Sequence, residues 1–411
     1  RHRRRLDGDR VRHLLLHVGH RAARLHLGHG PHALGPDLPA DEVHGVGAAD
    51  VERTAEGLEE VAHRLEVDRI GRLDLGGRLA RLLDFALAGM SVRTACVEEA
   101  DRLAGARVIF AVRVDEFGAP AALHSLLRAL RSHPGCLRGC VGGVIVDASG
   151  ELYSKAAAQA LVFAANSAGC LFPGKPLVEG TGSLYNQHIF AATQGLSLEQ
   201  AYFARARALC ERVASFTPPK FDRPKLLMLH ASSNPGSNTV WMGRQTLARL
   251  PQSIRTQEIL LQNGTVQDCR GCSYEACRHF AEGGRCFYGG AVTEQVLPAV
   301  QQADGVLLLC PNYNDAVSAN MTAFFNRLTN LAVVRELWDT YVWAVVVSGF
   351  SGSDLVARQV LGAMCLNKAA ILPPRFCLLQ TANDPGAAAE AENVGTRLDV
   401  FAKSIVDTLL P

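Results

Sequence analysis

The feature that most constrains the fold is an apolar strand that runs directly into a small polar loop and then a helix. The strand is the run 225–231, the loop is 232–239, and residues 240–250 have a helical pattern. This order places backbone N–H groups at the positive end of a helix dipole, where an anion is well held. The loop has neither the lysine of a nucleoside-triphosphate loop nor the glycine spacing of a dinucleotide fold, so we expect a monophosphate group there.

Two further strands end in polar loops of the same kind. Residues 304–310 form an apolar run typical of a strand buried on both faces of a parallel sheet, and the polar loop 311–321 follows it. A third strand at 342–347 runs into the glycine-bearing loop 348–353. Each loop alone could be a plain turn. Because ligands of open α/β sheets bind at the carboxyl ends of the strands, the three loops are expected to meet at one place.

From about residue 224 to residue 411 the sequence resembles the flavodoxin-like NAD(P)H-dependent FMN reductases, and within them the iron–sulfur flavoproteins. The flavin loop of that family, Pro-x-Tyr followed by Val-Ser-Ala-x-Met, matches residues 311–321. The Asp-Arg pair that closes the next helix in the family is Asn326-Arg327 here, and a common family lysine is replaced by Thr322. The resemblance implies an α/β fold with a doubly wound, flavodoxin-like parallel sheet of order 2-1-3-4-5 in the C-terminal half.

The resemblance also implies an FMN-dependent oxidoreductase that passes electrons from NAD(P)H to a small acceptor such as a quinone. FMN does the redox chemistry itself, so we name no catalytic side chain. The alternative interpretation makes Tyr313 an ordinary half-buried aromatic and Ser318 an N-cap. The expected cofactor-binding residues are Ser232, Ser233, Asn234, Gly236, Ser237, Asn238, Thr239, Pro311, Asn312, Tyr313, Asn314, Ser318, Ser348, Gly349, Phe350 and Gly352.

Four of the 12 cysteines lie close together, at Cys269, Cys272, Cys277 and Cys286. No apolar run is long enough to span a membrane, and we expect a cytoplasmic protein, in which clustered cysteines bind metal or do redox chemistry. Four thiolates suit an iron–sulfur cluster or a structural zinc. The resemblance implies a [4Fe–4S] cluster, although the third family cysteine usually follows the second by two residues and not four. Free thiols lining the flavin pocket are the alternative.

Two other functions fit the same residues. One is a non-enzymatic electron carrier of the flavodoxin type, and the other is an iron–sulfur flavoprotein that transfers single electrons. The net charge of +2 and the scarcity of aromatics among the basic residues give no reason to expect a nucleic-acid partner. We expect a small-molecule electron acceptor and no membrane partner, and a homo-oligomer is a possible assembly.

We expect a second α/β unit within residues 90–216, N-terminal to the unit that begins near residue 224. The stretch 143–169 repeats the strand, loop and helix order of 305–331, which predicts a degenerate flavodoxin-like copy. The loop after the first strand of this copy carries Asp115 and Glu116, which would repel a phosphate. We therefore expect one FMN per chain, held by the C-terminal unit. The first unit would cover part of the flavin site or form a dimer-like face within the chain.

The first 89 residues differ in composition from the rest. They hold nine of the 14 histidines and fourteen arginines but no lysine or cysteine. We interpret 1–89 as an extension that is disordered or is not native, with a real leader as the alternative. The proline-rich stretch 217–224 is the expected linker between a domain at 90–216 and an FMN-binding domain at 225–411.

Overall fold

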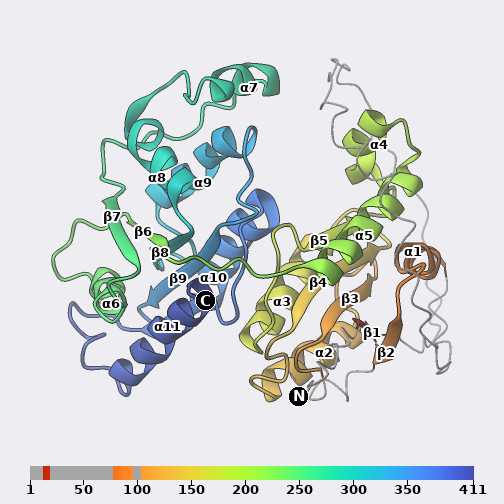
Figure 1. The fold of residues 1–411 in the computed structure, drawn as a ribbon, viewed down its shortest axis with the longest axis horizontal. Coiled ribbons are helices and arrows are strands. Elements are labelled where there is room, and N and C mark those ends of the chain that lie inside the picture. Colours follow the sequence, from red (N-terminus) through yellow and green to blue (C-terminus); the bar gives the residue numbers. More distant parts are fainter. Residues whose placement is uncertain (1–12, 19–76, 96–102) are drawn as a thin grey trace, which may run out of the picture.

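The computed structural model describes residues 13–18, 77–95 and 103–411, and it contains two parallel five-stranded sheets (Figure 1). The strand orders are β2-β1-β3-β4-β5 in the first sheet and β10-β9-β8-β6-β7 in the second. Numbered within its own unit, each sheet has the order 2-1-3-4-5. The predicted doubly wound parallel sheet in the C-terminal half, preceded by a second α/β unit, is therefore confirmed.

The C-terminal unit alternates strands and helices along the chain. Its elements are β6 (Lys225–His230), α6 (Asn238–Leu247), β7 (Arg255–Leu260), α7 (Tyr274–Glu282), a π-helical turn (Val292–Val296), α8 (Leu297–Gln302), β8 (Gly305–Pro311), α9 (Ala319–Ala332), β9 (Tyr341–Ser348), α10 (Ser353–Leu361), a second π-helical turn (Gly362–Leu366), β10 (Cys377–Thr381) and α11 (Val394–Leu409).

The first unit has the same alternation. Its elements are β1 (His13–Val18), α1 (Arg78–Ala86), β2 (Val92–Ala95), β3 (Arg107–Val114), α2 (Ala121–Ser132), β4 (Val141–Ala148), α3 (Ser154–Ser167), β5 (Leu177–Gly180), a 3-10 turn (Tyr185–Gln187), α4 (His188–Gln194) and α5 (Leu198–Ser215). Among the described residues, no helix is both long enough and apolar enough to cross a bilayer.

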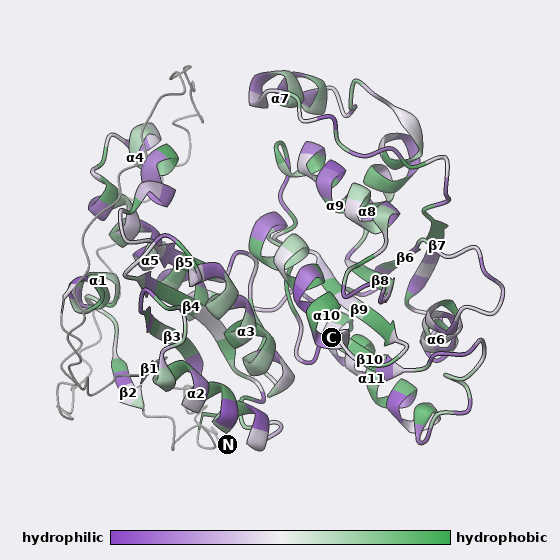
Figure 2. Ribbon diagram, turned by 180° about the vertical axis from the view of Figure 1, so that it is seen from behind, coloured by the Kyte–Doolittle hydropathy of each residue, from purple (hydrophilic) through white to green (hydrophobic). Residues whose placement is uncertain are grey.

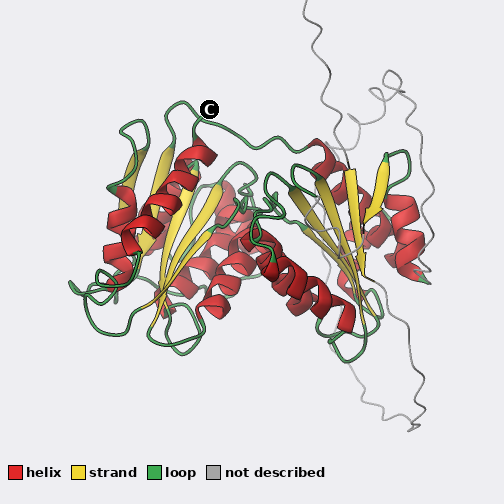
Figure 3. Ribbon diagram, turned by 90° about the horizontal axis from the view of Figure 1, so that it is seen from below, coloured by secondary structure: helices red, strands yellow, loops and turns green. Residues whose placement is uncertain are grey.

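The central strands of both sheets are buried because helices cover both faces (Figure 3). Every residue of β4 and β9 is buried, whereas the edge strand β7 is largely exposed. The uninterrupted apolar sequence of β9 fits this position, since a strand covered on both faces has no polar side. Green ribbon in the middle of each sheet marks the same apolar layer in Figure 2.

The structure differs from the predicted boundary at residue 90 between an extension and the N-terminal domain. Strand β1 pairs in parallel with both β2 and β3, and α1 packs on α5 through Leu79, Leu82 and Leu83. These two elements supply the first strand and first helix of the N-terminal unit, so part of 1–89 belongs to that unit. The remainder of 1–89 lies outside the described residues, and its non-native origin stays a hypothesis.

The register predicted for the internal repeat is also different in the structure. Strand β4 is the fourth strand of its sheet and corresponds to β9, not to β8. The loop that carries Asp115 and Glu116 accordingly follows the third strand, β3, and not the first. The difference in register has a physical origin, because successive strand–loop–helix units share one hydrophobic pattern. The first strand, β1, also lies in the segment 1–89, whose composition is atypical.

The two units contact each other through corresponding segments. Phe172 and Leu372 form an antiparallel bridge, with reciprocal N–H···O bonds of 3.0 and 2.9 Å. The bridges of Leu171 to β4 and of Ile371 to β9 precede this contact in each unit. Residues that differ by 200 in number therefore have equivalent positions, as in a two-fold dimer. This confirms the dimer-like face within the chain.

Asn166, at the end of α3, is the central polar residue of this interface. Its Nδ2 donates to the carbonyls of Cys170 and Pro373, and its Oδ1 accepts from the N–H of Phe376. The side chain is buried, so it satisfies three main-chain groups that water does not reach. Asn166 thereby fixes the end of α3 to the segment that leads into β10.

Replacing Asn166 with alanine should destabilise the interface. An Asn166→Ala variant leaves three buried polar groups without partners, and we expect a loss of about 3 kcal/mol in unfolding free energy, measured by denaturant titration. Ser167→Ala is the matched control, because the exposed Ser167 hydroxyl only donates to the carbonyl of Phe163. Equal stability of the two variants would contradict this role.

Candidate functional site

The loop between β6 and α6 is folded by its own side chains. Ser232 Oγ accepts from the N–H of Asn234, and Asn234 Oδ1 accepts from the N–H of Gly236 at 2.9 Å. Ser237 is the N-cap of α6, where its Oγ accepts from the N–H of Val240. The first residues of a helix have no intrahelical acceptor, so the N–H groups of Asn238 and Thr239, which precede the capped Val240, can face an anion. The first turn contains no acidic residue.

Asn238, the first residue of α6, connects this loop to the chain after β10. Its Nδ2 donates to the carbonyl of Asp384 at 2.8 Å, and its Oδ1 accepts from the N–H of Ala388. Asn383 in turn lies against the loop after β9, where a Cβ on Gly349 would come within 2.7 Å of Asn383 Oδ1. The loops after β6, β9 and β10 therefore meet at one edge of the sheet.

The segment 382–388 is a part of the site that the sequence interpretation missed. It follows the last strand and contains Asn-Asp-Pro-Gly, the same kind of polar turn that ends the other strands. The polar residues after β10 are therefore the same sequence signal as those after β6, β8 and β9, and they indicate that 382–388 lies at the same edge of the sheet.

The loop after β8 begins with a tight two-residue turn. Tyr313 and Ala316 exchange both main-chain hydrogen bonds, at 3.0 and 3.1 Å, around Asn314 and Asp315. Asn314 and Asp315 have φ values of 53° and 60°, the left-handed pair that closes such a turn. Gln359 of α10 holds the turn in place, since its Oε1 accepts from the N–H of Val317 and its Nε2 donates to the carbonyl of Asp315.

Asn312 joins the loops after β8 and β9. Its Nδ2 donates to Ser348 Oγ at 3.1 Å and to the carbonyl of Ser351 at 2.9 Å. Gly352 has a φ of 82°, and a Cβ there would overlap Asp315 Oδ1, so only glycine fits at this crossing. With this contact, all three predicted loops are assembled at the carboxyl ends of β6, β8 and β9.

The predicted binding residues divide into framework residues and accessible residues. Ser318 caps α9, and Ser348 is fully buried with its hydroxyl bonded to Ser353, so both stabilise the loops themselves. Tyr313 and Phe350 are 55% and 82% exposed, which leaves two aromatic faces open at the site. Contact of the predicted residues with FMN stays a prediction.

The cysteine-bearing segment lies along α9, the helix that follows the flavin loop. Asn320 in its first turn donates to the carbonyl of Leu261, and Asn326 donates to Asp268, next to Cys269. The buried Arg327 donates to the carbonyl of Gly289 and to Thr293 Oγ1. The Asn326-Arg327 pair thus anchors both ends of the cysteine segment to α9.

The three other cysteines lie close enough to Cys277 to affect its pKa, but the four do not form a ligand set. Burial raises the pKa of Cys277, a hydrogen bond from Asn330 opposes this, and the charges of the three other thiols raise the pKa further. Cys269 and Cys272 are exposed, whereas Cys277 and Cys286 are half-buried. In the described part of the chain, no three Cys, His, Asp or Glu side chains are grouped closely enough to hold a metal ion. The predicted [4Fe–4S] cluster is therefore not shown.

The corresponding place in the first unit is filled by a cation. Helix α1 links the first and second strands as α6 does, and Arg78 is its first residue. Arg78 Nε donates to Asp147 Oδ1 at 2.7 Å, and Nη2 donates to the carbonyls of Ala148 and Thr181. Burial raises the pKa of Asp147, and the ion pair with Arg78 opposes that rise. The guanidinium thus binds the loops after β4 and β5 where the C-terminal unit has Asn238.

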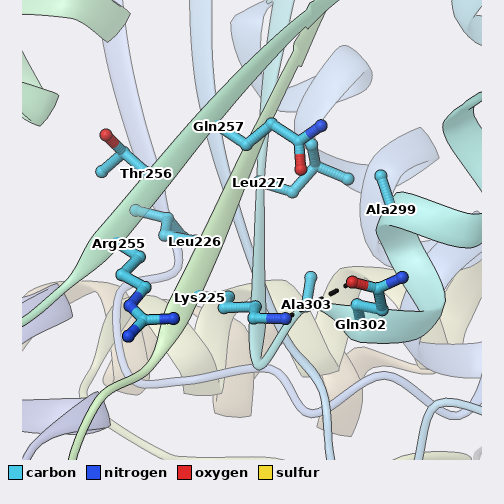
Figure 4. A pocket seen from close by; sticks show the side chains of 9 residues that line it. All are labelled: Lys225, Leu226, Leu227, Arg255, Thr256, Gln257, Ala299, Gln302 and Ala303. Atoms are coloured by element: carbon cyan, nitrogen blue, oxygen red, sulfur yellow. Dashed lines mark hydrogen bonds between the residues drawn. The ribbon is translucent and has the colours of Figure 1, made fainter.

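A shallow pocket of about 210 Å³ lies at the other end of the second sheet (Figure 4). Lys225 and Arg255 are the first residues of β6 and β7, so the pocket is at the amino ends of the strands. It is therefore separate from the four loops described above. Its lining residues are Lys225, Leu226, Leu227, Arg255, Thr256, Gln257, Ala299, Gln302 and Ala303.

Part of the chain matches a known family. Residues 224–384 match the family described as NADPH-dependent FMN reductase. An iron–sulfur flavoprotein of Methanocaldococcus jannaschii is 29% identical over 139 residues, which are 33% of this chain and 69% of the relative. The match agrees with the predicted oxidoreductase and with FMN and NAD(P)H as its cofactors.

Two solved structures have low similarity to this chain. An azoreductase from Bacillus anthracis is 16% identical, covers 44% of this chain and 97% of its own, and has a TM-score of 0.34. An NAD(P)H:quinone oxidoreductase from Methanothermobacter marburgensis is 14% identical, covers 44% of this chain and 95% of its own, and has a TM-score of 0.34.

The burial of the cysteines predicts two classes of thiol reactivity. In metal-free protein, Cys269 and Cys272 should react rapidly with an aromatic disulfide reagent because they are exposed. Burial raises the pKa of Cys310 to about 12 and also raises that of Cys365, so these thiols should react only after unfolding. Loss of the fast phase in a Cys269→Ser, Cys272→Ser double variant checks the assignment, and fast labelling of Cys310 would contradict it.

Proposed function

We propose that the chain binds one FMN and uses NAD(P)H to reduce a small acceptor such as a quinone, because residues 224–384 match the family described as NADPH-dependent FMN reductase. The observation that carries the proposal is the meeting of four loops at the carboxyl edge of one parallel sheet. In an open α/β sheet that edge is where ligands bind.

The residues at this edge fit a mononucleotide in three respects. The first turn of α6 offers main-chain N–H groups to the phosphate, and no acidic side chain stands there to repel it. The exposed rings of Tyr313 and Phe350 offer apolar surface to the isoalloxazine. Gly349 brings the main chain of the loop after β9 close to Asn383 without a side chain between them.

The protein's part in the reaction is to bind, orient and shield. When bound, FMN supplies hydride transfer from NAD(P)H and onward reduction of the acceptor. The Asn312 bonds between the loops after β8 and β9 and the Gln359 bonds to the turn at 314–315 hold the ring-binding loops in fixed positions. Because these loops are fixed before FMN binds, they lose less conformational entropy on binding. No side chain needs to act as a general acid or base.

A negative charge in the phosphate loop tests the proposal. Ser233→Asp places a carboxylate in the exposed loop, and we expect it to weaken FMN binding more than about tenfold by repelling the phosphate. Ser253→Asp is the matched control, because Ser253 is equally exposed but precedes β7, at the opposite end of the strands. The measurements are FMN titration by fluorescence quenching and NAD(P)H oxidation with a quinone. Wild-type protein that fails to bind FMN would contradict the proposal.

The occupied Arg78 site leads us to propose a single flavin per chain. The Arg78 guanidinium stands at the start of α1, and its donors are used by Asp147, Ala148 and Thr181 and so are not left to a phosphate. We expect one FMN per polypeptide when flavin and protein are quantified on the same saturated sample. A ratio of two would mean that the first unit also binds flavin.

A second candidate function is single-electron transfer through an iron–sulfur cluster. Its supporting observation is that the three other thiols lie close enough to Cys277 to affect its pKa, on a segment tied to α9, whose N-cap Ser318 belongs to the flavin loop. The residues that would hold the cluster are Cys269, Cys272, Cys277 and Cys286. Iron and sulfide analysis of anaerobically purified protein separates this candidate from free thiols, and negligible NAD(P)H turnover would instead favour a pure electron carrier. The exposed reduced thiols fit the proposed cytoplasmic location.

A further inference from the structure

A buried histidine lies directly beneath the phosphate loop. His230 is the last residue of β6 and is 4% exposed. Its Nδ1 lies 3.1 Å from the main-chain carbonyl oxygen of Ser232, and its Nε2 lies 3.0 Å from Glu258 Oε1. Both ring nitrogens therefore face hydrogen-bond acceptors, one of them inside the loop itself.

This pair of contacts decides the protonation state of the ring. A neutral imidazole carries one N–H, so one of its nitrogens would direct a lone pair at an oxygen. An imidazolium donates from both nitrogens and satisfies both contacts. A buried cation also needs a counter-charge, and the carboxylate of Glu258 supplies it.

The surroundings keep Glu258 ionised and leave a net positive charge. Arg244 of α6 donates to both carboxylate oxygens, at 2.8 and 3.3 Å, and this hydrogen bonding is the main reason that the pKa of Glu258 is lowered. Glu258 on β7 thus faces both Arg244 and the ring of His230. On the other side, β8 places the apolar Leu309 opposite His230. Across the loop, Asp384 contacts Asn238 through its carbonyl oxygen.

We infer that His230 is an imidazolium that supplies the positive charge of the FMN phosphate site. Residues 231–239 contain no lysine or arginine, so main-chain dipoles alone would otherwise face a dianionic phosphate. His230 donates to Ser232, and this bond both fixes the loop and places the charge under it. The inference rests on the proposed function, because it assigns the recognition of the same cofactor.

Two measurements on the full chain test this assignment. Long-range ¹H–¹⁵N correlation spectra of the flavin-free protein near pH 7 should show protons on both Nδ1 and Nε2 of His230. FMN titrations at pH 7 should show a dissociation constant about tenfold higher in His230→Gln than in wild type. His188→Gln, an exposed histidine on α4, is the control and should match wild type.

A second variant keeps the test decisive if His230→Gln does not fold. Glu258→Gln removes the counter-charge, so the same spectra should show only one ring proton on His230 in this variant. A neutral His230 tautomer in wild-type protein at pH 7, or equal FMN affinity in wild type and His230→Gln, would overturn the inference. Wild-type protein that binds no FMN would instead overturn the proposed function, and the spectra of His230 would still report its charge.

Discussion

The parallel direction of the strands is the constraint on which the rest of the structure depends. When strands run in parallel, every polar loop that follows one of them emerges at the same edge of the sheet. In the C-terminal unit this brings together the loops after β6, β8, β9 and β10, which no local interaction in the sequence would connect. Asn312 and Asn238 then join the loops in pairs, so the binding edge is a single hydrogen-bonded assembly.

The chain contains this sheet arrangement twice, and the two copies differ at the start of their first helix. Both sheets have the same strand order, and positions 200 residues apart, such as Phe172 and Leu372, meet across the interface. At the start of the first helix, however, the C-terminal unit has Asn238 and open N–H groups, whereas the first unit has Arg78 paired with Asp147. One residue type at an equivalent position therefore separates the proposed phosphate site from a closed structural contact.

Much of the C-terminal unit was predictable because its strands are uninterrupted apolar runs and its loops are polar. The apolar strand of β8 and the small residues of 232–239 indicated both the sheet and its binding edge. The first unit was harder, since β1 lies in a segment of atypical composition and repeated strand–helix units resemble one another in any register. The roles of Arg78 and His230 depend on partners such as Asp147 and Glu258, which are far away in sequence and become neighbours only in the fold.

The central claim is that an FMN phosphate sits at the first turn of α6. The most direct measurement is the change in main-chain amide chemical shifts when FMN is added to ¹⁵N-labelled protein. The account predicts that the amides of Asn238, Thr239 and Gly349 shift most strongly, because they lie at the carboxyl edge of the second sheet. The largest shifts at Lys225 and Arg255, at the opposite edge, or no shifts at all, would contradict it.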